Sequence, residues 1–189
     1  PRDGERPLYD FPIGSLYKRE QAAYLLSRTL GWPKVPLTLI REGPYGVGSM
    51  QLYVESDPRI TYFDLIGDHT DQLRKFAVFD LLANNADRKG GHCLQDSGGK
   101  IWSIDHGLTF HSEMKVRTVI WDFCGERIPK HLLKRLSALY TEFEAPEGLL
   151  REIQETIHPD EMDALRRRVR WVLSEGVYPG LPGRNRRGR

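Results

Sequence analysis

Two aspartates with chemically active neighbours mark one stretch of the sequence. Asp87 lies in the polar run NNADRKGGH together with Lys89 and His92, and Asp105 lies in the run WSIDHG. Phosphoryl transfer uses such groups: an acid that orients a hydroxyl, a cation that balances phosphoryl charge, and ligands for a divalent metal. The residue types therefore predict a site for phosphate chemistry, provided that the fold brings the two runs together.

A buried helix and a tight hairpin are the elements expected to bring them together. The segment Asp71–Ala83 is apolar on most of its circumference, which predicts a helix in the core that ends just before the polar run. Two short strands, His92–Leu94 and Lys100–Ile104, are expected to pair around a glycine-containing turn. Because paired strands lie about 4.8 Å apart, this hairpin returns Asp105 to the side of Asp87.

The remaining pattern predicts further helices and a second, earlier hairpin. Ser15 is a candidate N-cap of the first helix, and Gly31 is a suitable residue to end it. The order of elements is that of an α+β fold. The predicted helices are Leu16–Leu30, Lys130–Glu142, Glu147–Thr156 and one from Pro159 to about Gly176, and the predicted early strands are Val35–Ile40 and Met50–Val54.

Composition narrows the class of protein. A chain of 189 residues with 39% hydrophobic residues can form one domain, or one domain divided into two lobes. No run approaches the ~18 apolar residues of a membrane span. The two cysteines have no C-x-x-C spacing, so a reducing cytoplasm is the expected location. Aromatic and basic residues are not interleaved, which argues against nucleic-acid binding.

The positive charge is concentrated at the C-terminal end. Four arginines lie in residues 184–189, and without them the formal net charge falls from +2 to −2. A segment rich in Gly, Pro and Arg has too little apolar surface to order itself. Residues 178–189 are therefore predicted to be a disordered basic tail, which could contact an anionic partner.

The runs NNADRKGGH and WSIDHG resemble the catalytic loop and metal-binding turn of the phosphatidylinositol 3- and 4-kinase-like family, and most closely a compact, actinobacterial-type branch of it. The upstream runs GERPLYDFPIG, KREQAAYLLSRTLGW and GPYGVGSMQLYVE are similar to the same branch. The resemblance covers most of the first 110 residues. It implies a protein-kinase-like, two-lobed fold with a truncated N-lobe in residues 1–55 and a mostly helical C-lobe in residues 56–177.

The resemblance also implies a role for each site residue. Asp87 would orient the substrate hydroxyl, and Lys89 would lie near the transferred phosphate. Asp105 would bind the metal together with His92, which stands where related kinases have asparagine. Glu20 matches the acid that normally pairs with a strand lysine. The hinge that meets the adenine of ATP would consist of Gln51, Leu52, Tyr53 and Val54.

Two departures from the family pattern affect these expectations. An imidazole at His92 shifts the metal preference from magnesium toward metals such as manganese. No glycine-rich G-x-G-x-x-G loop and no strand lysine stand ahead of Glu20 in the sequence. The resemblance implies that such a segment would have to lie before Pro1.

Three functions follow as hypotheses. The first is an ATP- and metal-dependent kinase that acts on a protein hydroxyl, including its own, or on a soluble metabolite, because no basic amphipathic helix is present to hold anionic lipid. The second is a metal-dependent hydrolase that uses His92, Asp105, His106 and His111. The third is a non-catalytic, kinase-like module that binds nucleotide without turnover.

Overall fold

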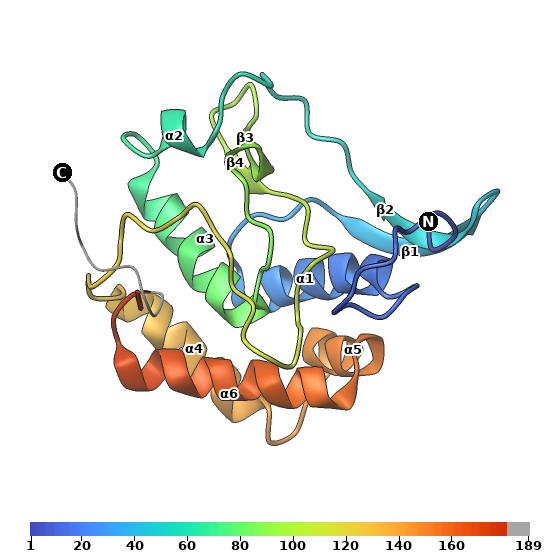
Figure 1. The fold of residues 1–189 in the computed structure, drawn as a ribbon. Helices are drawn as coiled ribbons and strands as arrows, with labels where there is room; N and C mark the ends of the chain where they lie inside the picture. Colours follow the sequence, from blue (N-terminus) through green and yellow to red (C-terminus); the bar gives the residue numbers. More distant parts are fainter. Residues whose placement is uncertain (181–189) are drawn as a thin grey trace.

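The computed structural model describes residues 1–180 of the 189-residue chain. Helices and two small hairpins make up the fold, which confirms the predicted α+β class (Figure 1). A 3₁₀ turn at Gly90–His92 precedes the second hairpin. The elements are α1 (Leu16–Leu30), β1 (Thr38–Gly43), β2 (Gly46–Gln51), α2 (Tyr62–Leu65), α3 (Thr70–Ala83), β3 (Cys93–Gln95), β4 (Ile101–Ser103), α4 (Lys130–Glu142), α5 (Gly148–Thr156) and α6 (Pro159–Glu175).

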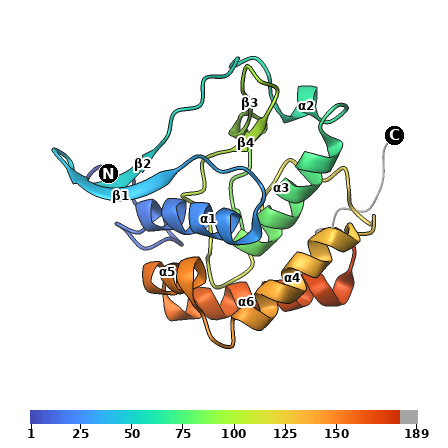
Figure 2. The same cartoon turned by 180° about the vertical axis from the view of Figure 1, so that it is seen from behind.

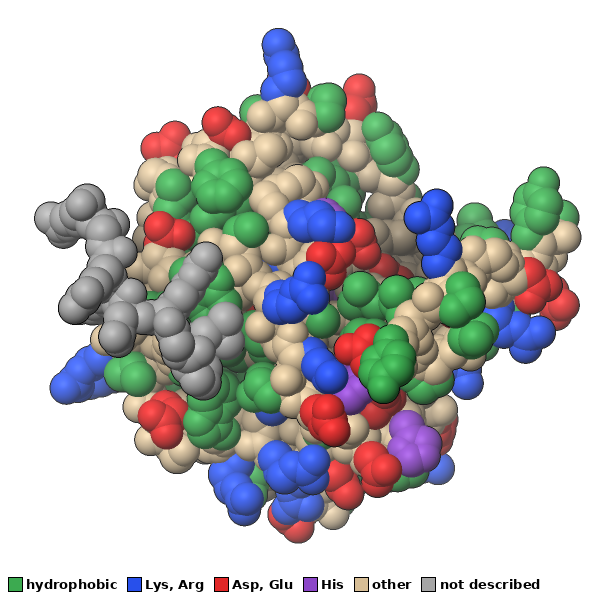
Figure 3. Space-filling model, in the orientation of Figure 1, with side chains coloured by type: hydrophobic (Ala, Val, Ile, Leu, Met, Phe, Trp, Pro, Cys, Tyr) green, Lys and Arg blue, Asp and Glu red, His purple; other side chains and the backbone are tan. Residues whose placement is uncertain are grey.

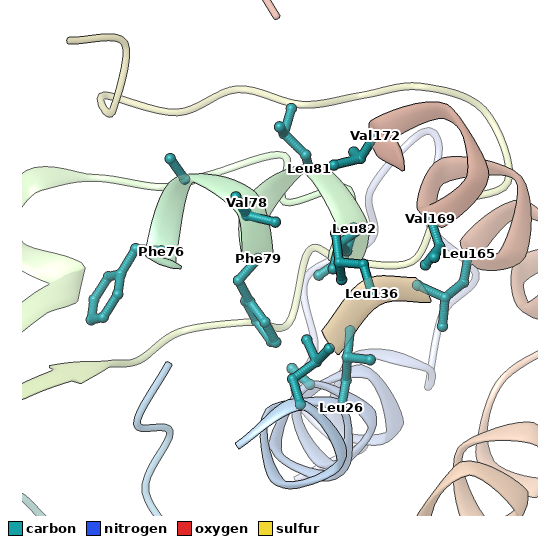
Figure 4. Packing of buried hydrophobic residues seen from close by; sticks show 14 of the residues in the cluster. Leu26, Phe76, Val78, Phe79, Leu81, Leu82, Leu136, Leu165, Val169 and Val172 are labelled. Atoms are coloured by element: carbon teal, nitrogen blue, oxygen red, sulfur yellow. The ribbon is translucent and has the colours of Figure 1, made fainter. Parts of the chain in front are cut away.

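Helix α3 lies at the centre of the hydrophobic core. Figures 1 and 2 show its C-terminal end close to α1, with α4 and α6 below both helices. In Figure 4, Leu26 of α1, Leu82 of α3 and Leu136 of α4 converge, and all three side chains are fully buried. Truncating such a leucine to alanine typically costs about 2–5 kcal/mol. The helix that leads into the polar run is therefore fixed by packing on several sides.

Helix α1 has the predicted bounds but a different N-terminal cap. Ser15 occupies the N-cap position, yet its side chain forms no capping hydrogen bond, and its hydroxyl donates to the Pro12 carbonyl. The Leu16 amide instead donates to the carboxylate of Glu5 at 3.2 Å. Ser15 was thus predicted at the correct position, but the expected capping bond from its side chain was wrong, and the preceding loop folds back to place the Glu5 carboxylate at the helix start.

The early hairpin forms, but nearer to its turn than predicted. Strands β1 and β2 are antiparallel, with Thr38 opposite Gln51 and Gly43 opposite Gly46. The glycines of the loop enter the ladder, so β2 begins at Gly46 and ends before Val54. The predicted strand Met50–Val54 was therefore wrong in its second half. The later hairpin pairs Cys93 with Ser103, close to its predicted position.

The C-terminal segment is packed where it was expected to be disordered. Tyr178 is 3% exposed, lies in the hydrophobic core and donates its hydroxyl to the Arg74 carbonyl at 3.2 Å. Its ring contacts Phe123, which supplies the apolar partner that composition alone did not reveal. The predicted tail boundary at residue 178 was therefore wrong for Tyr178. Residues 181–189 of the predicted tail lie outside the described residues.

Among residues 1–180, no helix is long and apolar enough to cross a membrane.

Candidate active site

Asp87 and Lys89 lie side by side in the loop that follows α3. The Lys89 ammonium contacts the Asp87 carboxylate at 2.7 Å, and both side chains reach solvent. The Asp87 amide donates to the side-chain oxygen of Asn85 at 3.0 Å, which fixes the loop backbone beneath the carboxylate. The loop thus presents a carboxylate and an ammonium group to solvent, and the Asn85 side chain holds its backbone.

Arg88, between them, points in the opposite direction. Its guanidinium forms an ion pair at 2.8 Å with Asp80 of α3, and neither side chain is exposed. It also donates to the carbonyls of His92 and Ile104, at 3.2 and 3.0 Å. One buried cation thereby joins α3, the loop and the segment that carries Asp105. No role was predicted for Arg88, because nothing in the sequence distinguishes an inward arginine from an exposed one.

His92 and Asp105 lie in contact, as the predicted hairpin required. The imidazole Nε2 of His92 lies 3.2 Å from the Asp105 carboxylate, and the Ile104 amide donates to the His92 carbonyl at 3.1 Å. Burial lowers the pKa of His92, and the Asp105 charge acts in the opposite direction. The negative charge of Asp87 likewise acts to raise the pKa of His92. The hairpin therefore brings the two acidic runs into one site.

Glu20 reaches this site from α1, but not to bind a lysine. Its carboxylate accepts a hydrogen bond from the His106 amide at 2.8 Å. Burial raises the pKa of Glu20 to about 7, and the nearby Asp105 charge adds to the rise. Within residues 1–180 Glu20 has no ion pair with a lysine. In this structure, then, the residue expected to pair with a strand lysine holds the backbone of the Asp105 turn.

His106 is fully buried behind the turn. Burial lowers the pKa of His106 well below its usual value, and the Arg88 charge adds to this effect, so the ring is neutral. Its Nε2 lies 3.1 Å from an Arg88 nitrogen and 2.8 Å from the Ser103 hydroxyl. Because the arginine can only donate, Nε2 is an acceptor, which assigns the proton to Nδ1. His106 is thus a structural support for the turn.

The expected hinge residues lie at the end of β2 and directly after it. Gln51 donates its side-chain amide to the Thr38 hydroxyl at 2.9 Å, and the Leu52 amide donates to the Leu37 carbonyl at 2.8 Å. The Leu52 amide is thus already paired within the hairpin. Leu52 also lines a cavity of about 490 Å³, together with Lys100 and Trp102. Tyr53 is 84% exposed and Val54 is half-buried, and neither lines this cavity.

The structure brings two candidate metal ligands together, His92 and Asp105. Among the described residues, no cluster of three or more His, Cys, Asp or Glu side chains is placed to hold a metal ion. His92 and Asp105 supply one imidazole and one carboxylate at contact distance. A divalent ion that is held by one or two protein ligands and by substrate phosphates requires no more than this. The donor set fits a nucleotide-bound metal, and manganese accepts its nitrogen ligand more readily than magnesium does.

The chain is similar to a mycobacterial protein and to two plant proteins. No protein-family model matches the chain. Protein Rv2133c of Mycobacterium tuberculosis is 40% identical, over 97% of this chain and 78% of its own length. Phosphatidylinositol 4-kinase gamma 4 of Arabidopsis thaliana is 28% identical over 58% of this chain, and its Oryza sativa namesake is 29% identical over 63%. In both plant proteins the match covers 24% of their length.

Proposed function

Because the chain belongs to the same family as protein Rv2133c of Mycobacterium tuberculosis and is distantly similar to two plant proteins named phosphatidylinositol 4-kinase gamma 4, we propose that it is an ATP- and divalent-metal-dependent, kinase-like phosphotransferase. The observation that carries the proposal is the convergence of the Asp87–Lys89 pair and the His92–Asp105 pair on one exposed loop and turn. The proposed lobes are residues 1–55 and 56–177.

In this proposal, Asp87 orients the hydroxyl that receives the phosphate. Its carboxylate is accessible, and its backbone is held by Asn85 and, one residue later, by the buried Arg88. Lys89 lies against it and would turn toward the transferred phosphoryl group when substrate is present. Catalysis of phosphoryl transfer is mainly positioning and charge stabilisation, so a rigid loop that carries an acid and a cation is suited to it.

His92 and Asp105 would hold the metal. A divalent ion there would bridge phosphate oxygens and neutralise their charge. Glu20 holds the His106 amide, the next residue after Asp105, and so fixes the direction in which the Asp105 carboxylate points. The adenine would lie near the residues that follow β2, with Gln51, Leu52, Tyr53 and Val54 as the proposed hinge.

The proposed acceptor is a hydroxyl of a protein, including this one, or of a soluble metabolite. The plant relatives are named for a lipid substrate, but they match over less than two thirds of this chain. Function belongs to a site rather than to a fold, so their substrate does not transfer with the resemblance. A cytoplasmic location is proposed with this acceptor class.

One observation favours a second candidate, a nucleotide-binding module without turnover. Glu20 bonds to the turn and is not paired with a lysine among residues 1–180. In a kinase that lysine contacts the nucleotide phosphates. If Glu20 stays bonded to the turn, such a lysine is left without its partner, and the protein would bind ATP and metal but transfer phosphate slowly or not at all.

Thermal unfolding with ATP and magnesium or manganese tests the proposal. A ligand at 100 times its dissociation constant stabilises by about 2.7 kcal/mol, which is a readable shift of the midpoint. We expect the shift to need metal, to disappear in Asp105→Asn and to persist in the exposed control Asp68→Asn. No shift with either metal would refute both candidates, and a shift without phosphate transfer to any acceptor would favour the non-catalytic module.

A further inference from the structure

Arg168 of α6 has a nitrogen that is buried without a partner. The side chain is 5% exposed. Its Nε donates to the Leu82 carbonyl at 2.7 Å, and Nη1 donates to the His111 carbonyl at 3.2 Å. Nη2 is buried and finds no hydrogen-bond partner in the described part of the chain. A charged donor in this state is costly unless something supplies the missing acceptor.

A small cavity adjoins this guanidinium. Its volume is about 220 Å³, and we call it the arginine pocket. Among residues 1–180, no acidic side chain belongs to its lining. The lining residues are Ser112, Met114, Ala164, Arg167, Arg168 and Trp171.

The charges around the arginine pocket leave Arg168 under-compensated. Burial lowers the pKa of Arg168 to about 9, and the positive charge of the adjacent Arg167 adds to the fall. Glu161 acts in the opposite direction but does not offset it. Figure 3 shows several basic side chains near the lower edge of the molecule, the side on which Figure 1 draws α6. An anion in the pocket would face two arginines.

We propose that the arginine pocket binds a phosphate-class oxyanion, held by the Arg167 guanidinium, the Ser112 hydroxyl and, after a small shift that opens the buried Nη2 to the pocket, by Arg168. Guanidinium groups match phosphate oxygens with short, charge-assisted hydrogen bonds. The pocket is too small for a nucleotide's base and sugar together with its phosphates, but it accommodates one phosphate group. This proposal does not depend on the proposed kinase activity.

The same side chain connects the arginine pocket to the candidate active site. The His111 carbonyl accepts from Arg168 and also from the side chain of Asn84, at 2.8 Å. Asn84 begins the loop that carries Asp87. An anion bound to Nη2 would complete a polar network that runs from α6 through the segment after Phe110 to that loop, and it would stabilise the segment in its present position.

Titration of the full chain with inorganic phosphate tests the inference, with chloride at equal ionic strength as the reference. The amide of Ser112 and the indole N–H of Trp171, followed by NMR, report on the pocket directly. Arg167→Gln should raise the phosphate dissociation constant about tenfold or more, as expected for the loss of one charged hydrogen bond. Arg167 is exposed, so this variant should fold.

Arg170→Gln is the matched control, because Arg170 is an exposed arginine of the same helix that does not line the pocket. It should bind phosphate like the wild type. Arg168→Lys keeps the charge but removes the guanidinium geometry, and it should weaken binding as well. Equal dissociation constants in all four proteins, or no saturable shift of the Ser112 and Trp171 signals, would overturn the proposal.

A second arm identifies the source of the phosphate. Vesicles of phosphatidylcholine that contain phosphatidic acid present the same group on a membrane surface. Sedimentation with these vesicles that is lost in Arg167→Gln but kept in Arg170→Gln would assign the site to a lipid headgroup. Binding of free phosphate without such sedimentation would assign it to a soluble molecule.

Discussion

Arg88 and Asp80 form an ion pair from which solvent is fully excluded, with 2.8 Å between nitrogen and oxygen. The pair joins the last turn of α3 to the loop that displays Asp87 and Lys89. Asp87 and Lys89, which reach solvent, are thus attached to the core through the buried Arg88 between them.

Asp80→Asn should destabilise the protein by about 3–5 kcal/mol, because it leaves the Arg88 charge buried without its counter-charge. Urea unfolding measures this change. Glu155→Gln removes the partner of Arg151 in an exposed pair of 3.1 Å and should change stability by no more than about 0.5 kcal/mol. Similar losses in the two variants would contradict a special role for the buried pair.

Asp87→Asn should lower phosphate transfer by about 10²–10⁴-fold, the usual contribution of a positioned acid–base group. The midpoint shift produced by ATP and metal should remain, because Asp87 is not one of the proposed metal ligands. Transfer from labelled ATP and thermal unfolding, measured on the same preparation, separate the two effects. Loss of the nucleotide-induced shift in Asp87→Asn would show that the residue binds ligand instead.

Glu20 should make stability depend on pH. Its pKa is about 7 in the folded protein and 4.5 ordinarily, so folding favours the protonated form. This preference has no effect below pH 4.5. As the pH rises from 4.5 to about 7 the unfolded chain ionises first, and the free energy of unfolding falls by up to about 3 kcal/mol.

Glu20→Gln should remove this fall while leaving the other carboxylates unchanged. The difference in free energy of unfolding between wild type and Glu20→Gln should therefore move in favour of the variant from pH 4.5 to 7 and stay constant above that. Urea titrations of both proteins at several pH values give this difference. Parallel curves would mean that the Glu20 pKa is not raised.

Asn84 combines a left-handed backbone with a full set of side-chain bonds. Its φ is 55°, and its side chain bonds the carbonyls of His111 and Glu113 and the amide of Lys115, at 2.8, 2.6 and 2.7 Å. Asn84→Gly should cost about 3 kcal/mol for the lost bonds. Asn84→Ala should cost about 1 kcal/mol more, because alanine resists positive φ. A higher unfolding midpoint for Asn84→Ala than for Asn84→Gly would contradict this explanation.

Local patterns in the sequence were enough for the long helices, whereas the short helix α2 and the 3₁₀ turn Gly90–His92 were not predicted. Helix Leu16–Leu30 and helix Lys130–Glu142 match their predicted bounds, because apolar spacing and Gly31 or neighbouring prolines define them within a few residues. The β2 strand was placed too late, since its glycines pair in the ladder although glycine usually signals a loop. The buried Tyr178 was missed because its partners Arg74 and Phe123 are distant in sequence.

For the candidate site, the sequence predicted which side chains meet but not what holds them. The proximity of His92 to Asp105 follows from one hairpin and could be anticipated. The inward turn of Arg88 and the bond from Glu20 to the His106 amide depend on packing between separate elements. Residue type does not show whether a charged side chain next to a buried helix points into the core or into solvent.

The backbone of Asp105 has a φ of 57°, in the region that most side chains avoid. Asparagine and aspartate tolerate this conformation, whereas alanine opposes it by about 1–2 kcal/mol. Replacing Asp105 with alanine would thus remove a carboxylate and, in the same step, push the turn toward a different shape. The activity of an Asp105→Ala variant would therefore reflect both effects together. Asp105→Asn removes the charge while keeping a residue that tolerates this φ.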